Sequence, residues 1–324
     1  MKKTLSLLFI IFLFLGCNND GKKARTLSAS SGNINDVSVV VDNLLWQDSV
    51  GEAIRDVLAS PVEGLSIDEP LFSLRQMPPQ VFSDFTTKNR TIFIVKKGEE
   101  PRTTIKNNVY AKPQTVVLVT GQTNDEIIDQ LNSNKNEIVE AFKKAELKEK
   151  QRRIRKSLHE TEPIENALGI TLDFPTAYRI AVNDEEFFWI RKDINSGTMD
   201  MMIYEVPLST IRPGDSAVVD IIKMRDSIGQ KYIEGPVEGS YMITEKAYAP
   251  YKFNEELDGK PTIITKGLWD VKNYFMSGPF VNYAIRDEAN NRYLIAEGYV
   301  FAPSVDKRDN MFELEAIIKS LEFN

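Results

Sequence analysis

The first half of the chain alternates between short β-branched runs and segments with a helical period. Residues 37–41 form a valine-rich run that predicts a strand, and residues 91–96 and 115–120 predict two more. Apolar side chains recur three and four positions apart over residues 50–58, which predicts an amphipathic helix. Residues 63–79 hold prolines and apolar residues without a clear period, and we expect an ordered loop there.

The longest helical stretch covers residues 123–160 and is strongly charged. Its first part has an apolar inner face, and the polar residues from Asn132 to Asn136 predict a break into two helices. Residues 143–156 hold eight basic side chains and few apolar ones, which is typical of a solvated helix face. We therefore expect this part to be sparsely packed and open to proteases. Contact with anionic lipid or nucleic acid is the alternative interpretation of the same run.

The second half is rich in predicted strands, and the run 187–190 is apolar throughout, as in a strand buried on both faces. The expected strands are 170–174, 178–182, 186–192, 199–206, 240–246, 262–269, 280–286 and 292–301. A helix is predicted over 215–231, and a last helix aligns Met311, Leu314 and Ile318. The pattern predicts an α+β fold, in which antiparallel sheets pack against helices, with two α+β halves joined by the long charged helix.

The N-terminus has the pattern of an export signal. Lys2 and Lys3 precede an apolar run over residues 5–15, and the segment closes on Gly16-Cys17. Because this run is too short to cross a hydrocarbon layer of about 30 Å, it does not predict a membrane span. Apolar residues followed by Gly-Cys resemble a bacterial lipobox, so we expect cleavage before Cys17 and acylation of its thiol. A plain secretory signal with an accidental cysteine is the alternative.

These patterns divide the chain into four parts. Residues 1–16 are expected to be a lipoprotein signal peptide, and residues 17–33 a flexible tether of small and polar residues. Residues 34–160 would form an N-terminal α+β domain that ends in the long helix, and residues 161–324 a C-terminal α+β domain.

Composition excludes several classes of function. The 324 residues carry 40 Lys and Arg against 47 Asp and Glu, a formal net charge of −7 at pH 7. Since an acidic surface repels a phosphate backbone, nucleic acid is not expected as a partner. Cys17 is the only cysteine, and its acylation would leave no thiol for a disulfide, a thiolate metal site or a nucleophile. We expect no metal and no cofactor.

Few side chains suggest catalysis. The only histidine, His159, ends a charged helix and has no nearby nucleophile or second ligand in the sequence. Asp193, Asn195 and Gly197 resemble part of a calcium loop, but the distal glutamate is missing, and a hairpin turn is the better interpretation. The acidic runs 184–186 and 255–256 could supply the two carboxylates that glycoside hydrolysis requires.

Aromatic residues are dense after Trp269. Tyr274, Phe275 and Phe280 could line a groove for a glycan or a peptide, although core packing is the commoner role of such residues.

The segment after the tether resembles a known family. The residues that carry the resemblance are Val39-Val40-Val41-Asp42, Leu45-Trp46, Val50-Gly51, Ile54-Arg55, Leu58-Ala59-Ser60-Pro61 and Glu69-Pro70-Leu71-Phe72. They are similar to the domain-of-unknown-function 4837 family, lipoproteins of the Bacteroidota, and the similarity extends from about residue 34 to the C-terminus. The family has no assigned activity, so the resemblance implies no catalytic residue. Residues 170–175 and the closing helix also resemble PsbP/Mog1-like domains at the level of fold.

The expected function is that of a membrane-anchored lipoprotein of the cell envelope, acting as a non-enzymatic binding or structural module. Its expected partners are the bilayer, through acylated Cys17, and an envelope protein or glycan that the sequence does not identify. Only Asp20 follows the cysteine closely before Lys22 and Lys23, so we expect an outer-membrane protein that faces the periplasm. A carboxylate-dependent hydrolase, for example on glycans, is the alternative.

Overall fold

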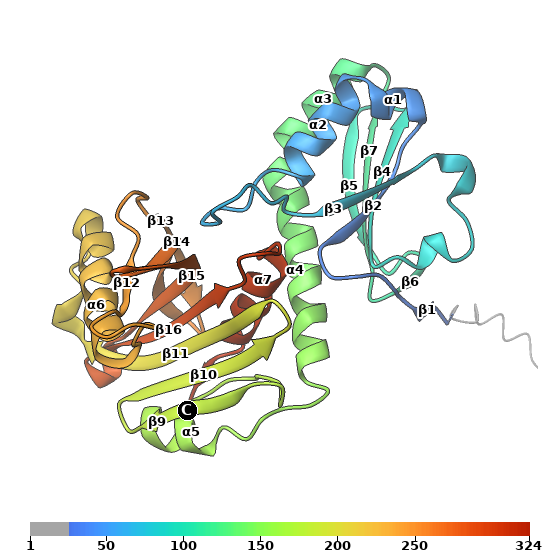
Figure 1. Ribbon diagram of the computed structural model, residues 1–324. Helices are drawn as coiled ribbons and strands as arrows, with labels where there is room; N and C mark the ends of the chain where they lie inside the picture. Colours follow the sequence, from blue (N-terminus) through green and yellow to red (C-terminus); the bar gives the residue numbers. More distant parts are fainter. Residues whose placement is uncertain (1–25) are drawn as a thin grey trace, which may run out of the picture.

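The computed structural model describes residues 26–324 and has two α+β halves that meet along one long helix, α4 (Figure 1). The predicted fold class is confirmed, including the long charged helix that joins the halves. No helix in the part of the chain described is long and apolar enough to cross a membrane.

The N-terminal half is built on a five-stranded sheet in the order β3-β2-β4-β7-β5. Its strands are β2 (Asp36–Val40), β3 (Ser73–Met77), β4 (Thr91–Lys97), β5 (Arg102–Asn107) and β7 (Thr115–Gly121). The expectation of antiparallel sheets is wrong here, because β3, β2, β4 and β7 run parallel and only β5 is antiparallel. Parallel neighbours require crossover connections, and the crossover from β2 to β3 is helical.

Helices cover one face of this sheet. They are α1 (Asn43–Gln47), α2 (Ser49–Leu58) and α3 (Asn124–Ser133). The capping residue of α3 is Thr123, whose hydroxyl accepts a hydrogen bond from the Glu126 backbone N–H. Val39, Phe93 and Val117 stand in register across the central strands and pack under these helices. The expected loop over 63–79 is wrong at its end, where β3 joins the sheet.

Helix α4 (Lys135–Ile154) begins after Asn134, which confirms the predicted break, and contributes to both halves. Phe142 packs in the N-terminal core, while Ile154 belongs to the core of the C-terminal half. The carboxylates Glu146 and Glu149 are also buried. The expectation of a sparsely packed helix is therefore wrong, because two of its charged residues face inward and find partners there.

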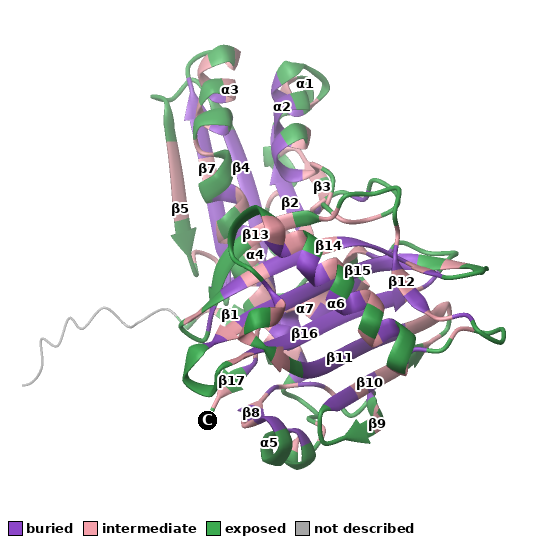
Figure 2. Cartoon of the chain, turned by 90° about the vertical axis from the view of Figure 1, so that its left-hand side faces the viewer, coloured by how far each residue is buried: buried purple, intermediate pink, exposed green. Residues whose placement is uncertain are grey.

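The C-terminal half is built on an eight-stranded antiparallel sheet in the order β12-β14-β15-β16-β11-β10-β9, with β13 also paired to β14. Its strands are β9 (Arg179–Asp184), β10 (Phe187–Ile194), β11 (Gly197–Pro207), β12 (Met242–Thr244), β13 (Tyr251–Leu257), β14 (Lys260–Val271), β15 (Tyr274–Asp287) and β16 (Arg292–Phe301). Figure 2 shows the central strands of both sheets buried, while the edge strands β5 and β9 are largely exposed.

Helices pack on both faces of the C-terminal sheet. Helix α6 (Ala217–Tyr232) covers one face, and α5 (Glu162–Leu168) and α7 (Arg308–Ile318) cover the other. Phe187 points toward α6 and its neighbour Phe188 toward α7, as predicted for a strand buried on both faces. The remaining pairs of short strands are β1 (Ser28–Ala29) with β6 (Ala111–Lys112), and β8 (Ile170–Thr171) with β17 (Glu322–Phe323).

Polar contacts tie the two halves together. The buried carboxylate of Glu69 accepts hydrogen bonds from the backbone N–H groups of Lys307 and Arg308, at the first turn of α7. An acidic group at a helix N-terminus satisfies free N–H groups and the helix dipole. Lys150 of α4 forms an ion pair with Glu313 of α7 at 3.0 Å. The N-terminal half thus supplies the cap of the last helix of the C-terminal half.

Candidate functional site: a basic groove beside α4

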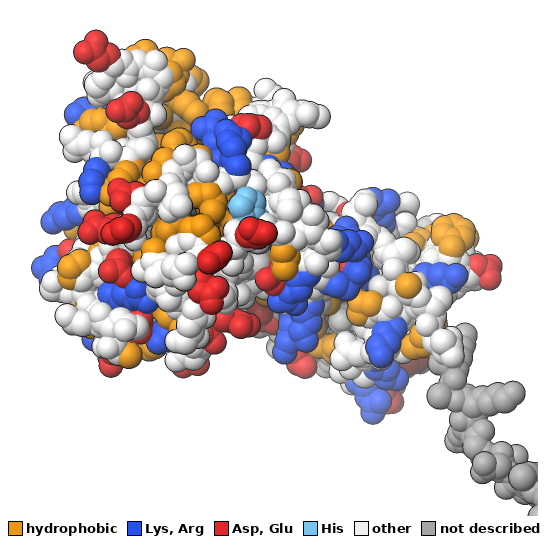
Figure 3. All heavy atoms as spheres, turned by 90° about the horizontal axis from the view of Figure 1, so that it is seen from below, with side chains coloured by type: hydrophobic (Ala, Val, Ile, Leu, Met, Phe, Trp, Pro, Cys, Tyr) orange, Lys and Arg blue, Asp and Glu red, His pale blue; other side chains and the backbone are white. Residues whose placement is uncertain are grey.

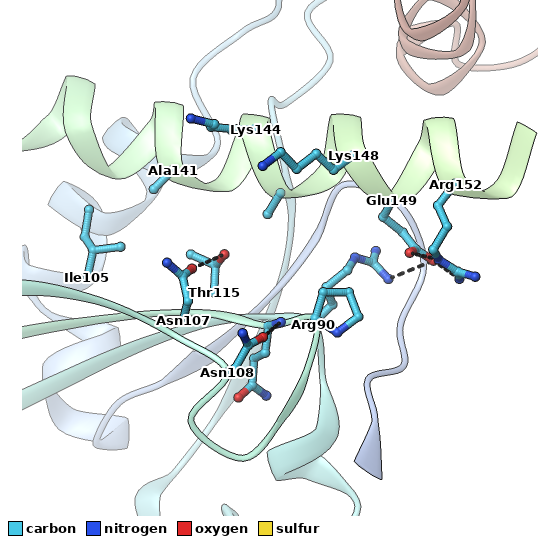
Figure 4. A pocket seen from close by; sticks show the side chains of 13 residues that line it. Arg90, Ile105, Asn107, Asn108, Thr115, Ala141, Lys144, Lys148, Glu149 and Arg152 are labelled. Carbon is cyan, nitrogen blue, oxygen red and sulfur yellow. Dashed lines mark hydrogen bonds and ion pairs between the residues drawn. The ribbon is translucent and has the colours of Figure 1, made fainter. Parts of the chain in front are cut away.

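A groove of about 640 Å³ lies between α4 and the edge of the N-terminal sheet (Figure 4). Ala141 and Ala145 face the groove from α4. Because their side chains are small, they leave open space between the helix and Ile105 of β5. Three longer residues of the same helix, Lys144, Lys148 and Arg152, follow at intervals of four, which places them along one side of the helix. The groove therefore has a row of cations as one wall.

The carboxylates near the groove are fully engaged by arginines. Glu149 receives two hydrogen bonds from Arg152, at 2.7 and 2.8 Å, and one from Arg153, at 2.8 Å. The hydrogen bonds from Arg152 chiefly hold the pKa of Glu149 down at about 2, and the charge of Arg90 contributes. Glu149 is therefore ionised at any physiological pH, and its charge is neutralised.

Arg90 is the most buried arginine of this network. Its guanidinium makes a bidentate contact with Glu146, at 2.8 and 2.9 Å, and both side chains are almost completely buried. Arg90 also donates to the backbone carbonyls of Gly32 and Asn33. The pair thus fixes the segment before β2 against α4.

Lys144 and Lys148, unlike these arginines, have no carboxylate partner within residues 26–324. Both are exposed, and neither forms an ion pair or a side-chain hydrogen bond within residues 26–324. Two glutamates face three arginines in the neighbouring network, so the two lysines add to an excess of positive charge. A concave site with such an excess attracts anions.

The opposite wall offers neutral hydrogen-bonding groups. Asn107 ends β5 and lies 3.3 Å from the hydroxyl of Thr115 on β7. Asn108 adopts a positive φ of 56°, which asparagine tolerates, and accepts a hydrogen bond from the Gln114 backbone N–H. The amide groups of these asparagines can donate to an anion that the lysines attract.

The groove lies at the end of the N-terminal half where the described chain begins. Ser28 and Ala29 of β1 pair with Ala111 and Lys112 of β6, directly before the groove residue Pro113. Figure 3 shows Lys and Arg side chains gathered over this end of the molecule. The predicted acylation site, Cys17, lies outside the described residues, eleven positions before Ser28.

The other residues singled out in the sequence lie elsewhere. His159 stacks on Phe174, with ring centroids 4.9 Å apart, and its Nδ1 is 2.8 Å from the carbonyl oxygen of Glu160. Asp193 and Gly197 lie at the β10–β11 hairpin, and Asp193 pairs with Arg179. Within residues 26–324, no group of three or more His, Cys, Asp or Glu side chains is arranged to hold a metal ion.

The paired acids of the sequence lie at an exposed turn and in a cleft. Asp184, Glu185 and Glu186 are exposed at the β9–β10 turn. Glu255 faces a cleft of about 310 Å³ between the halves, where it pairs with Lys319 at 2.9 Å. In the same cleft Glu315 pairs with Lys266 at 2.7 Å. Burial acts to raise the pKa of Glu315, but the lysine charge outweighs it and lowers the pKa overall.

The aromatic residues after Trp269 divide into two groups. Phe280 and Trp269 are buried, as core packing predicts, whereas Tyr274 and Phe275 are exposed at the tip of the β14–β15 hairpin. Sequence reasoning identified the basic run of α4 but not the opposite wall of the groove. Asn107, Asn108 and Thr115 reach the helix only because β5 and β7 pair, and no local pattern signals that contact.

Two family models match the chain. The domain of unknown function DUF4837 matches residues 157–320, and the domain of unknown function DUF8532 matches residues 30–155. The residues that suggested the first family, between 39 and 72, fall within the second match. No curated protein matches the sequence.

Solved structures share little with the chain. The crystal structure of the Saccharomyces cerevisiae Ran-binding protein Mog1p is similar at 10% identity and a TM-score of 0.32. The match covers 48% of this chain and 90% of Mog1p.

Proposed function

This chain belongs to the DUF4837 family, whose function is unknown, and we propose that it is a non-enzymatic binding module of the cell envelope. It is held in the outer membrane through acylated Cys17 and faces the periplasm. Its basic groove takes phosphate-bearing anionic groups. The observation that carries this proposal is the pair of unpartnered lysines, Lys144 and Lys148, which line the same groove as the amide groups of Asn107 and Asn108.

The chemistry of the groove favours phosphate over a carboxylate or a neutral ligand. A phosphate ester offers several acceptor oxygens, and ammonium groups bind it as point charges while amide N–H groups complete the contacts. Lys144 and Lys148 lie one helical turn apart, so their ammonium groups can approach the same phosphate. The neighbouring arginines are held by glutamates and keep the wall in place.

The position of the groove agrees with a membrane anchor. Ser28 lies eleven positions after Cys17, and a flexible coil of that length would span roughly 17–20 Å, or at most about 40 Å when extended. An anchored chain would hold the groove end within reach of lipid headgroups. Each lysine near an anionic membrane surface contributes about 1 kcal/mol to binding.

The hydrolase alternative has weaker support. Glycoside hydrolysis needs one carboxyl group that stays protonated near neutral pH beside a second that is ionised. In the interdomain cleft, Glu255 and Glu315 are each paired with a lysine, and the pKa of Glu315 is lowered. Glu315 therefore stays ionised and is not suited to act as the acid, and Glu255 is held in its ion pair with Lys319.

The test uses the mature chain with Cys17→Ser, so that acyl chains do not mask binding by the groove. One arm measures sedimentation with vesicles of phosphatidylglycerol in phosphatidylcholine, and the other measures calorimetric binding of glycerol phosphate and pyrophosphate. We expect Lys144→Gln with Lys148→Gln to weaken binding about 30-fold, since two lysines contribute about 2 kcal/mol. The effect should shrink as salt rises.

A charge-matched control separates the groove from general electrostatics. Lys223 and Lys246 are exposed lysines of the C-terminal half, and replacing both by Gln changes the net charge equally. We expect this control to bind as the parent does. Equal weakening in the two double variants would contradict the proposal, as would absence of binding in both arms. Binding of vesicles alone identifies a headgroup as the source of the phosphate, and binding in both arms identifies a general phosphate site.

A further inference from the structure

A second hollow, of about 260 Å³, lies in the C-terminal half and is independent of the basic groove. It opens on the face of the sheet that carries α6, beside the turn after that helix, at Ile233 to Pro236. Its walls come from five strands, β10, β11, β12, β14 and β16, together with Met276 of β15. We name this hollow the aromatic pocket, after Trp189, Trp269, Tyr299 and Phe301, which line it.

Strand register brings three polar side chains together in the aromatic pocket. Arg191 of β10 stands opposite Asp200 of β11, and Asp200 stands opposite Tyr299 of β16. Directly opposed residues of neighbouring strands point to the same face, so the three form one row across the sheet. The indole N–H of Trp189 donates to Asp200 Oδ1 at 3.0 Å, and Arg191 Nε lies 3.9 Å from the same oxygen.

Two polar atoms of this row are buried and have no hydrogen-bond partner within residues 26–324. They are the hydroxyl of Tyr299 and Nε of Arg191. A buried polar atom without a partner is unfavourable, and most such atoms in folded proteins are satisfied. Burial raises the pKa of Tyr299 well above its usual range, so the hydroxyl remains protonated and can donate. Tyr299 and Arg191 both line the hollow, so a ligand there can supply the missing partners.

The charge of the pocket favours a neutral ligand. Aromatic walls beside a carboxylate can also bind cations. Here, however, the guanidinium of Arg191 already lies over the Trp189 ring, 5.5 Å from its centroid. The same guanidinium offsets the charge of Asp200, so an added cation would meet a cation already in place.

The volume limits the size of the ligand. Pockets for drug-sized ligands enclose roughly 300–1,000 Å³, so a hollow slightly below that range suits a single ring. A pyranose has an apolar C–H face that packs on indole and phenyl rings, and its hydroxyls both donate and accept hydrogen bonds. Asp200 supplies an acceptor for such hydroxyls, and Tyr299 and Arg191 supply donors.

We propose that the aromatic pocket binds one neutral pyranose unit of a glycan, held between its aromatic walls by Asp200, Arg191 and Tyr299. Asp200 is buried, and its desolvation raises its pKa to about 6, so the carboxylate is ionised and accepts hydrogen bonds at neutral pH. This site lies in the other half of the molecule from the phosphate groove and does not depend on the proposed function.

The test follows tryptophan fluorescence during titration with glucose, galactose, mannose and N-acetylglucosamine. The chain has three tryptophans, and two of them line the pocket. In a Trp46→Phe background the signal therefore comes from the pocket alone. We expect a saturable change with at least one sugar and a Kd on the order of 1 mM, as for a small ligand with few contacts.

Two isosteric variants make the result specific. Tyr299→Phe removes the hydroxyl that borders the pocket, and it should weaken sugar binding about tenfold while leaving the melting temperature unchanged. Tyr204→Phe is the matched control, because its hydroxyl is also buried without a partner but does not line the pocket. It should leave sugar binding unchanged. Absence of saturable binding by all four sugars would overturn the proposal, as would equal weakening by the two variants, or saturable binding of tetramethylammonium in place of sugars.

Discussion

Each half of the described chain contains a buried arginine–glutamate pair with a bidentate contact, and these two pairs are used differently. In the N-terminal half Arg90 holds Glu146, and in the C-terminal half Arg225 holds Glu297 at 2.6 and 2.8 Å. All four side chains are at most 2% exposed. The chemistry is the same, yet the surroundings give the pairs different roles.

The C-terminal pair is enclosed by side chains of its own half. Arg225 also donates to Thr244, its guanidinium lies 3.5 Å from the centroid of Phe280, and Asn282 donates to Glu297. It fastens α6 to the sheet and borders none of the hollows described above. The N-terminal pair instead uses backbone groups of residues 32–35, and Arg90 borders the basic groove. A buried ion pair can thus lock a core, or it can hold the wall of an open site in place.

The largest expected loss of stability comes from breaking the enclosed Arg225–Glu297 pair. Glu297→Ala leaves Arg225 buried and uncompensated, and we expect it to lower the free energy of unfolding by about 3–5 kcal/mol. Glu146→Ala should have a smaller effect, because Arg90 keeps two carbonyl partners and lies 3.8 Å from Glu149. Urea unfolding of both variants measures the difference. If Glu146→Ala lowers the free energy of unfolding as much as Glu297→Ala, or more, the two pairs do not differ in the way described.

Loss of the contact between the halves should have the second largest effect on stability. Glu69→Ala removes a carboxylate that accepts from the backbone of α7, and we expect a loss of about 1.5–3 kcal/mol. Asp68→Ala is the control, because it removes the carboxylate next to Glu69 in the sequence, and this carboxylate is exposed. Thermal unfolding followed by calorimetry should also show the two halves less coupled in Glu69→Ala. A variant that unfolds like the parent would show that the cap does not join the halves.

The smallest expected effect concerns pH and the aromatic pocket. Burial raises the pKa of Asp200 from its usual 3.8 to about 6 in the folded chain, so the folded state holds the proton more tightly. This contribution to stability is complete below about pH 4 and is lost as the pH rises through about 6. Asp200→Asn removes the loss, so it should gain about 2 kcal/mol relative to the parent between pH 4 and 7.5. Urea unfolding of both chains at the two pH values checks this prediction. If the difference in free energy of unfolding between variant and parent is the same at both pH values, the prediction is wrong.

Much of the fold followed from local patterns. The apolar stripe of α2 and the strands of the C-terminal sheet were predicted because burial of one or both faces leaves a period in the sequence. The strands β3, β5 and β13 were missed, and so was the short helix α5. These strands have mixed burial and polar sequences such as Arg-Thr-Thr-Ile-Lys-Asn, so neither alternation nor an apolar run marks them.

The sites depend on contacts that no local pattern records. Glu146 and Glu149 belong to a run that resembles a solvated helix face, and they are buried only because Arg90, more than fifty residues earlier, reaches them. The sequence pointed to Tyr274, Phe275 and Phe280 as candidate groove residues, and none of them lines the aromatic pocket. Asp200 and Tyr299 of that pocket are brought together by the pairing of β11 with β16, about a hundred residues apart.

The proposed acylation of Cys17 gives the most direct test of the account, because the proposed membrane location and the proposed approach of the basic groove to lipid both depend on it. Cells expressing the native chain and the Cys17→Ser variant are broken, and their membranes are washed in high salt, which removes proteins held by charge alone. Stable anchoring needs more than one acyl chain, and a mature lipoprotein would meet that condition. We predict that the native chain stays with the outer membrane and that the variant is released into the periplasmic fraction. Retention of the variant in the salt-washed membrane would contradict the account.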